Sequence, residues 1–269
     1  MKDKSKKILL IIVAVVLIAI CGLLVVQYIR ALTQDVKNPM LTLEIENYGN
    51  VKIELYPEYA PNTVATIVTL VKNGFYENKV IYGKDQICLY VGRDTDGNVP
   101  LTKVSNLNTS VASGSDADKP VTIPGEFAEN GFTKNTLRHE KGVLSLIRND
   151  YTQSVSGLVE ESYNSGVSQI GIMMGENTSN LNGVYAAFGK VTEGLDILEK
   201  LYTEAKIQEP EVADDGTVQE TAIDKFATFP IIKSATVETY GVDFGLPVFM
   251  EAFDYESYMY DLIQTQYGS

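Results

Sequence analysis

Few side chains in this sequence are of the types that bind transition metals or attack a substrate covalently. The chain has one histidine, His139, and two cysteines, Cys21 and Cys88. Because Cys21 falls in an apolar N-terminal run and Cys88 stands alone far from it, we expect no intramolecular disulfide, no CxxC redox pair and no Cys/His zinc cluster. Arg93 and Arg148 remain as candidates for stabilising charge in a ligand or transition state. Whether they can do so depends on the strands and loops that position their side chains.

Five short motifs follow one another along the chain. They are Gly74-Phe75-Tyr76, Gly125-Glu126-Phe127, Asn130-Gly131-Phe132, Gly142-Val143-Leu144-Ser145 and Ala187-Phe188-Gly189-Lys190-Val191-Thr192-Glu193-Gly194. In order and approximate spacing this set resembles the cyclophilin-type peptidyl-prolyl isomerases, over about Leu41 to Val242. The resemblance implies a closed eight-stranded antiparallel barrel capped by two helices, and proline-containing peptides as ligands.

The resemblance also implies a mechanism, and the sequence departs from it at one position. Resonance gives the X–Pro amide a rotation barrier of roughly 18–20 kcal/mol. In the family, an arginine over the prolyl nitrogen favours the non-resonant form, with neither a cofactor nor a metal. Val80-Ile81-Tyr82-Gly83 stands where the family has an apolar pair followed by His-Arg. The catalytic position is therefore occupied by Gly83, and no catalytic residue is assigned.

Other positions of the family's substrate groove have changed as well. Leu181 and Ser168-Gln169 keep the family identity, whereas Gly171 replaces a phenylalanine of the proline pocket. The remaining replacements are Cys88 and Leu89 for the pocket Phe and Met, Val91 for the orienting Gln, Asn180 for the pocket Trp and Tyr185 for the pocket His. Losing one preorganised donor alone costs about 2.7–4 kcal/mol of transition-state stabilisation. Efficient proline isomerisation is therefore not expected.

Two arginines are candidates for a replacement role. Arg93 lies two positions after Val91, so on a continuing strand its side chain projects to the same face. It either reaches the groove or is a solvated residue of its rim. Arg148 follows Ser145-Leu146-Ile147 and is expected to line the groove as a structural or peptide-contacting residue. His139 matches a framework position of the family. The polar segment 150–167 is an insertion that either covers the groove or is an inert surface loop.

The periodicity of the domain predicts mainly β-structure. Alternation of apolar and polar residues predicts strands at 41–45 and 51–55, joined by a turn at 47–50. Pro61 is expected to open a helix that ends near Gly74. A second helix follows Thr192. Further strands are expected at 87–91, 142–147, 170–174 and 231–239, with irregular connections at 101–119 and 204–224.

The N-terminus predicts a membrane anchor. Residues 8–29 contain no charge, and an apolar run of this length spans the roughly 30 Å hydrocarbon core. The basic residues 1–7 are expected to stay cytoplasmic, with the C-terminal domain outside the cell membrane. A cleaved signal and a lipid-modified Cys21 are the alternatives. The expected divisions are a linker at 30–39, the barrel domain at 40–248 and an acidic aromatic tail at 249–269, with a helix over Met250–Ile263.

The negative net charge of the chain limits which classes of macromolecule it can bind. The net charge is −13 although the first seven residues are basic. An acidic domain does not provide the basic face that phosphate binding needs, so a nucleic-acid partner is excluded. Three hypotheses follow: a weakly active isomerase that assists exported proteins, a non-catalytic module that binds peptide or protein, and a structural partner in a membrane complex. The sequence predicts no oligomeric state.

Overall fold

The computed structural model describes residues 13, 15–17, 19–25, 37–111, 114–176, 178–210 and 222–267. The chain forms two compact units, Met1–Lys37 and Asn38–Ser269. In the first unit the described residues between 13 and 25 are helical and exposed. The rest of the expected anchor 8–29 lies outside the described residues, as do 1–7 and 30–36. Among the residues that are described, no helix is long and apolar enough to cross a bilayer.

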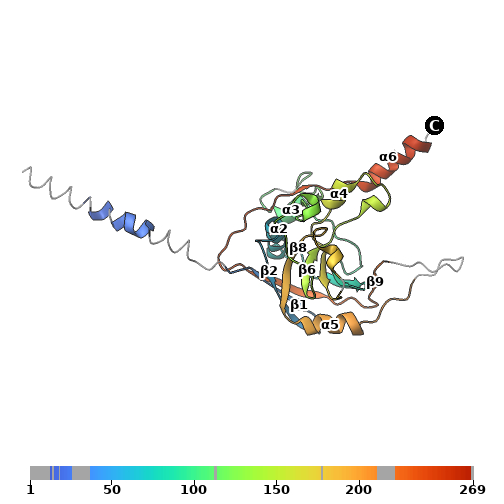
Figure 1. Ribbon diagram of the computed structural model, residues 1–269, viewed down its shortest axis with the longest axis horizontal. Helices are drawn as coiled ribbons and strands as arrows, with labels where there is room; N and C mark the ends of the chain where they lie inside the picture. Colours follow the sequence, from blue (N-terminus) through green and yellow to red (C-terminus); the bar gives the residue numbers. More distant parts are fainter. Residues whose placement is uncertain are drawn as a thin grey trace, which may run out of the picture. The chain divides into compact units, whose positions relative to one another are not determined.

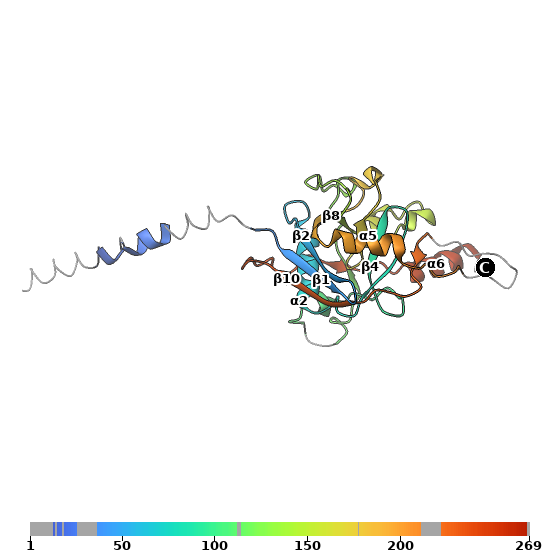
Figure 2. The ribbon, with the colours of Figure 1, turned by 90° about the horizontal axis from the view of Figure 1, so that it is seen from below.

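The second unit is built on one antiparallel sheet, which confirms the expected mainly-β fold (Figures 1 and 2). In spatial order its strands are β10 (Ile232–Glu238), β1 (Met40–Ile45), β2 (Gly49–Leu55), β8 (Ala187–Glu193), β6 (Val143–Leu146), β7 (Ile170–Met173), β4 (Cys88–Arg93), β3 (Val80–Lys84) and β9 (Asp224–Lys225). The predicted strand regions all lie in this sheet, whereas β3, β8 and the short strand β9 were not among the predicted strands.

The strand order corrects the expectation of a closed eight-stranded barrel. Within the described residues the sheet has nine strands in an open order that ends at β10 and β9. One isolated bridge, Val80 to Ile231, links β3 to the residue before β10. The backbone N–H of Ile81 adds a hydrogen bond to the Pro230 carbonyl at 2.9 Å. Asn78 N–H also donates to the Ile232 carbonyl at 2.8 Å, and Ile232 N–H donates to the Lys79 carbonyl at 2.7 Å. At the other end of β3, Gly83 and Lys84 pair with β9 instead.

The β1–β2 hairpin follows directly from the sequence pattern. Leu41, Leu43 and Ile45 alternate with half-buried residues and point into the core. Asn47 and Gly49 form the turn with positive φ angles of 64° and 114°, a conformation that favours Asn and Gly. The predicted hairpin is confirmed.

Two helices pack against this sheet and lie on opposite sides of the strands in Figure 1. The first, α2 (Pro61–Lys72), begins at its predicted proline and buries Val64, Ile67, Val68 and Val71. Gly74 follows its end with φ of +71°, the left-handed conformation expected there. The second, α5 (Leu195–Glu204), buries Leu198 and Leu201 and packs against β2.

The Gly-Glu-Phe motif has a structural role that the sequence did not reveal. The Glu126 carboxylate accepts hydrogen bonds from the backbone N–H groups of Asn62 and Thr63 and from Thr63 Oγ1. Glu126 therefore caps the first turn of α2 from a segment distant in the sequence. Ala60, the residue at the N-cap position, has no side chain that could do so. An anionic cap also interacts favourably with the positive end of the helix dipole.

Shorter elements surround the sheet. They are α3 (Val104–Leu107), β5 (Val121–Thr122), α4 (Val159–Tyr163), β11 (Met250–Glu251) and α6 (Tyr255–Tyr267). The expected tail helix Met250–Ile263 begins later than predicted, because Met250 and Glu251 pair with β5 instead. Part of the segment 101–119, expected to be irregular, forms α3.

Candidate functional site

A cavity of about 510 Å³ lies where β3, β4 and β6 meet the loops 147–153 and 165–169. Most of the groove residues expected from the sequence line it: Cys88, Arg93, Arg148, Gln169, Leu181 and Tyr185. Ala222 and Ile223, which lead into β9, close one side. The cavity is therefore the candidate functional site.

Three expected groove residues lie elsewhere. Leu89 and Val91 are 0% and 1% exposed and belong to the hydrophobic core. Side chains alternate along β4, so Cys88 and Tyr90 face the cavity while Leu89 and Val91 face the hydrophobic core. Asn180 is exposed in the 3₁₀ turn Ser179–Leu181 and does not line the cavity.

Gly171 lies beneath the cavity, where the absence of a side chain leaves room for neighbouring residues. A Cβ atom at this position would come within 2.6 Å of Cys88 Sγ and 2.7 Å of Ile147 Cδ1. These two side chains therefore occupy the space directly above the glycine. Burial raises the pKa of the Cys88 thiol well above its usual value, so the thiol is neutral there.

Gly83 lies on β3 with its backbone against β9. Gly83 pairs with Lys225 and Lys84 pairs with Asp224. A Cβ atom on Gly83 would be 2.4 Å from the Asp224 carbonyl oxygen and 2.9 Å from Ile223 Cγ2. No residue with a side chain fits at position 83 while β9 stays in place. Glycine within a strand often marks such a close backbone approach, and this was the only signal of β9 in the sequence.

Phe226 anchors β9 in the domain. Its side chain is 1% exposed and is part of the main hydrophobic core. Its backbone N–H donates to the Tyr82 carbonyl at 3.0 Å. On the other side of the segment, Gln208 N–H donates to the Lys225 carbonyl at 2.8 Å. The described part of this segment is thus an integral edge of the sheet.

Arg93 is held in the cavity by an aromatic ring. Its guanidinium carbon lies 4.0 Å from the centre of the Tyr82 ring, and Nη1 donates to the Gly97 carbonyl at 3.1 Å. Arg93 Nε is buried and has no hydrogen-bond partner among the described residues. Burial raises the pKa of Tyr82 to about 12, and the charge of Arg93 opposes part of that rise. Arg93 therefore lines the groove and is not a freely solvated rim residue.

Arg148, which also lines the cavity, lies among three aromatic rings. Its guanidinium carbon is 4.5 Å from the Tyr185 ring centre, 5.0 Å from that of Tyr163 and 5.6 Å from that of Phe127. Within the described part of the chain, its nitrogens donate to the backbone carbonyls of Val184 and Asn149, both at 3.3 Å. Cation–π contacts of this kind fix the direction of the guanidinium.

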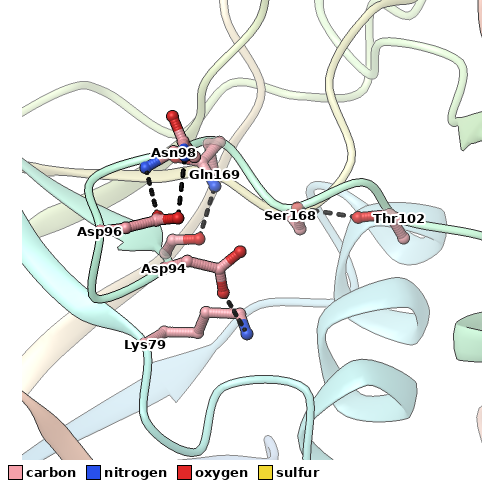
Figure 3. A network of polar contacts seen from close by, with 8 residues as sticks. Lys79, Asp94, Asp96, Asn98, Thr102, Ser168 and Gln169 are labelled. Carbon is pink, nitrogen blue, oxygen red and sulfur yellow. Dashed lines mark hydrogen bonds and ion pairs between the residues drawn. The ribbon is translucent and has the colours of Figure 1, made fainter.

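Figure 3 shows how the retained Ser168-Gln169 pair is positioned. Gln169 Nε2 donates to the Gly92 carbonyl at 2.7 Å, next to Arg93, while Gln169 Oε1 is buried without a partner. Ser168 Oγ accepts from Thr102 Oγ1 at 2.9 Å. Nearby, Lys79 forms an ion pair with Asp94 at 2.9 Å. The amide of Gln169 is thus fixed with its acceptor oxygen unused.

The insertion 150–167 contributes one wall of the cavity through Asp150, Gln153 and Ser165. Its Tyr151 ring stacks on Tyr255 of the tail, with ring centres 4.7 Å apart and an angle of 13°. The Phe253 and Tyr151 rings also meet in an edge-to-face arrangement, with ring centres 5.6 Å apart. Together with the β5–β11 pair, these contacts attach the start of the tail to the wall of the groove.

His139 lies outside the cavity. It is 3% exposed, with its ring nitrogens 3.1 Å from Asn182 Oδ1 and 3.0 Å from Ser145 Oγ. Burial lowers its pKa, so the ring is neutral near pH 7. This placement agrees with the framework role expected from the sequence.

Comparison with known proteins places these features in a family. Residues 40–226 match the family described as cyclophilin type peptidyl-prolyl cis-trans isomerase/CLD. Two curated relatives are a peptidyl-prolyl cis-trans isomerase of Arabidopsis thaliana and peptidyl-prolyl cis-trans isomerase B of Bacillus subtilis. The first is 30% identical over 58% of this chain and 57% of its own length. The second is 29% identical over 58% of this chain and 86% of its own length.

Among solved structures, a cyclophilin type peptidyl-prolyl cis-trans isomerase of Cryptosporidium parvum is similar at 19% identity with a TM-score of 0.47. That match covers 74% of this chain and 98% of the other. The family match spans well over half of the sequence and includes every residue that lines the cavity. The chain belongs to the cyclophilin type peptidyl-prolyl cis-trans isomerase family.

Proposed function

We propose that this protein is a peptide-binding member of the family with weak or absent isomerase activity. Its ligands are proline-containing segments, including those of exported proteins during folding. The single observation that carries the proposal is the contact between Gly83 and the Asp224 carbonyl. It leaves no room for an arginine at the position where the family resemblance implies one.

The rest of the cavity supports binding rather than catalysis. Catalysis by this mechanism depends on a donor preorganised over the prolyl nitrogen. Arg93 is turned onto Tyr82 and Arg148 is held between aromatic rings, so each is already engaged in a fixed contact. The cavity nevertheless combines apolar walls with a few placed polar groups, the composition typical of ligand sites.

An assay of cis-to-trans isomerisation on a short proline peptide tests the proposal directly. The full-length chain in detergent is expected to give no acceleration over the uncatalysed reaction, which takes tens of seconds or longer. A fluorescently labelled proline peptide is expected to bind saturably, measured by anisotropy. Tyr185→Ala is expected to weaken that binding because Tyr185 lines the cavity.

Tyr260→Ala serves as the matched control, because Tyr260 is 64% exposed on α6 and does not line the cavity. Its affinity for the peptide is expected to equal that of the unmodified protein. Turnover comparable to that of an ordinary cyclophilin contradicts the proposal, as does the absence of any saturable peptide binding.

We also propose that residues 8–29 anchor the protein in the cell membrane, with the domain on the extracytoplasmic side. The uncharged run between Lys7 and Arg30 and the lysines before it support this orientation. The protein is expected to stay in the membrane pellet after alkaline carbonate extraction, and its domain to be cleaved by protease added to spheroplasts. Recovery in the soluble fraction, or protection from the protease, contradicts the anchor or its orientation.

A further inference from the structure

The cavity carries two arginines that form no ion pair within 4 Å among the described residues. Ion pairs within 4 Å in the described part of the chain are formed by lysines. Arg93 and Arg148 instead donate to backbone carbonyls and stack on aromatic rings. The protein has a net charge of −13, yet these two positive charges meet no carboxylate within 4 Å among the described residues. Arg148 acts on Asp150 only at longer range, where it adds to the Thr152 hydrogen bond in lowering the pKa of that carboxyl.

The two acids that also line the cavity are engaged by neighbouring donors. Asp85 accepts from the backbone N–H groups of Ile87 and Cys88 and from the Tyr90 hydroxyl at 2.7 Å. Asp150 accepts from Thr152 and Gln153 on its own turn. Neither carboxylate forms a hydrogen bond or close ion pair with the arginines.

Two residues that line the cavity, Arg93 and Gln169, each carry a buried polar atom without a hydrogen-bond partner among the described residues. Arg93 Nε is a donor and Gln169 Oε1 is an acceptor, and both are unsatisfied among the described residues. Buried groups of this kind are normally hydrogen-bonded, because leaving one unpaired is unfavourable. An acidic residue of a bound peptide offers both complements, a carboxylate for the arginine and a backbone N–H for the glutamine.

We infer that the groove selects peptides that carry an aspartate or glutamate side chain close to the proline, and that Arg93 and Arg148 read this carboxylate. Arginine suits the task because its planar guanidinium can donate two parallel hydrogen bonds to one carboxylate. The aromatic contacts hold both guanidinium groups in place before the peptide arrives, which reduces the entropy lost on binding. This inference rests on the proposed peptide-binding function and names its specificity.

Labelled peptides that differ in one residue test the inference. All have a blocked C-terminus and one proline, and the neighbouring residue is Glu, Gln or Lys. We expect the Glu peptide to bind at least about tenfold more tightly than the Gln peptide. We expect the Lys peptide to bind most weakly and the preference for Glu to shrink at high salt. A fourth peptide, neutral but with a free C-terminal carboxylate, distinguishes a side-chain carboxylate from a chain terminus and is expected to bind like the Gln peptide.

Variants of the full-length protein assign the preference to residues. Arg93→Ala and Arg148→Ala are each expected to reduce the Glu-over-Gln ratio several-fold, whereas Arg93→Lys and Arg148→Lys retain part of it. Arg138→Ala is the matched control, because Arg138 is exposed and lies outside the cavity. A variant whose denaturation midpoint equals that of the unmodified protein is folded. If an alanine variant is not folded, the corresponding lysine variant shows whether the arginine reads the carboxylate.

The peptide measurements distinguish a failure of the acidic selectivity from a failure of the proposed peptide binding. Equal affinity for the Glu and Gln peptides overturns the acidic selectivity while the proposed peptide-binding function stands. A preference that persists in both alanine variants also overturns it, because the carboxylate is then read elsewhere. Tightest binding of the free C-terminal peptide shows that a chain terminus is the ligand and overturns the side-chain assignment. If none of the peptides binds, the proposed function fails and the selectivity fails with it.

Discussion

Replacing Gly83 with arginine is expected to destabilise the domain and to leave proline isomerisation unrestored. The new Cβ atom would lie 2.4 Å from the Asp224 carbonyl oxygen, a backbone atom that cannot move aside without disturbing β9. Overpacking of this kind typically costs about 1–3 kcal/mol. A lower free energy of unfolding in urea, together with an unchanged isomerisation rate, is the expected result for Gly83→Arg.

A second glycine serves as the control that distinguishes the clash at position 83 from a general destabilisation by replacing glycine. Gly157 has open space around its hypothetical Cβ and no positive φ. Gly157→Ala is therefore expected to be neutral or to stabilise by up to about 1 kcal/mol through the unfolded state. If Gly83→Arg is as stable as the unmodified protein and gains turnover, β9 does not exclude an arginine and the non-catalytic proposal fails.

Replacing Phe226 with alanine is expected to have the largest effect on stability. Phe226 is 1% exposed, and its removal leaves a cavity in the core where β9 joins the sheet. Truncation of a buried phenylalanine to alanine typically costs about 3–5 kcal/mol. We expect a loss of this size in denaturant unfolding. We also expect faster amide hydrogen exchange at residue 226, whose N–H donates to the Tyr82 carbonyl.

Lys225→Ala is the control for the Phe226 substitution, because Lys225 is exposed on β9 and directly precedes Phe226. Its unfolding free energy is expected to stay within about 0.5 kcal/mol of the unmodified protein. Phe226→Leu keeps most of the buried volume and is expected to lie between the two. A change for Phe226→Ala no larger than for Lys225→Ala shows that β9 is not anchored through this side chain.

The sequence alone determined the features that depend on local spacing. Alternation of apolar residues defined β1 and β2, and Pro61 and Gly74 marked the ends of α2. The ordered motifs identified the family, and the glycine at position 83 was visible as a departure from it. These features are readable because a turn, a cap or an alternating strand is specified by residues that are near one another in the chain.

Only the tertiary structure decided how those features combine. The carboxylate of Glu126 caps a helix that begins far from it in the sequence, and Tyr151 stacks on a tail residue, Tyr255. The face of β4 on which Leu89 and Val91 lie depended on the register of the strand, which places both in the core. Most importantly, β9 pairs with β3 across Gly83 although the two segments are remote in the chain. A sequence shows that position 83 has no side chain. It does not show which backbone segment fills the space, because that depends on strand pairing between residues far apart in the chain, which local patterns do not encode.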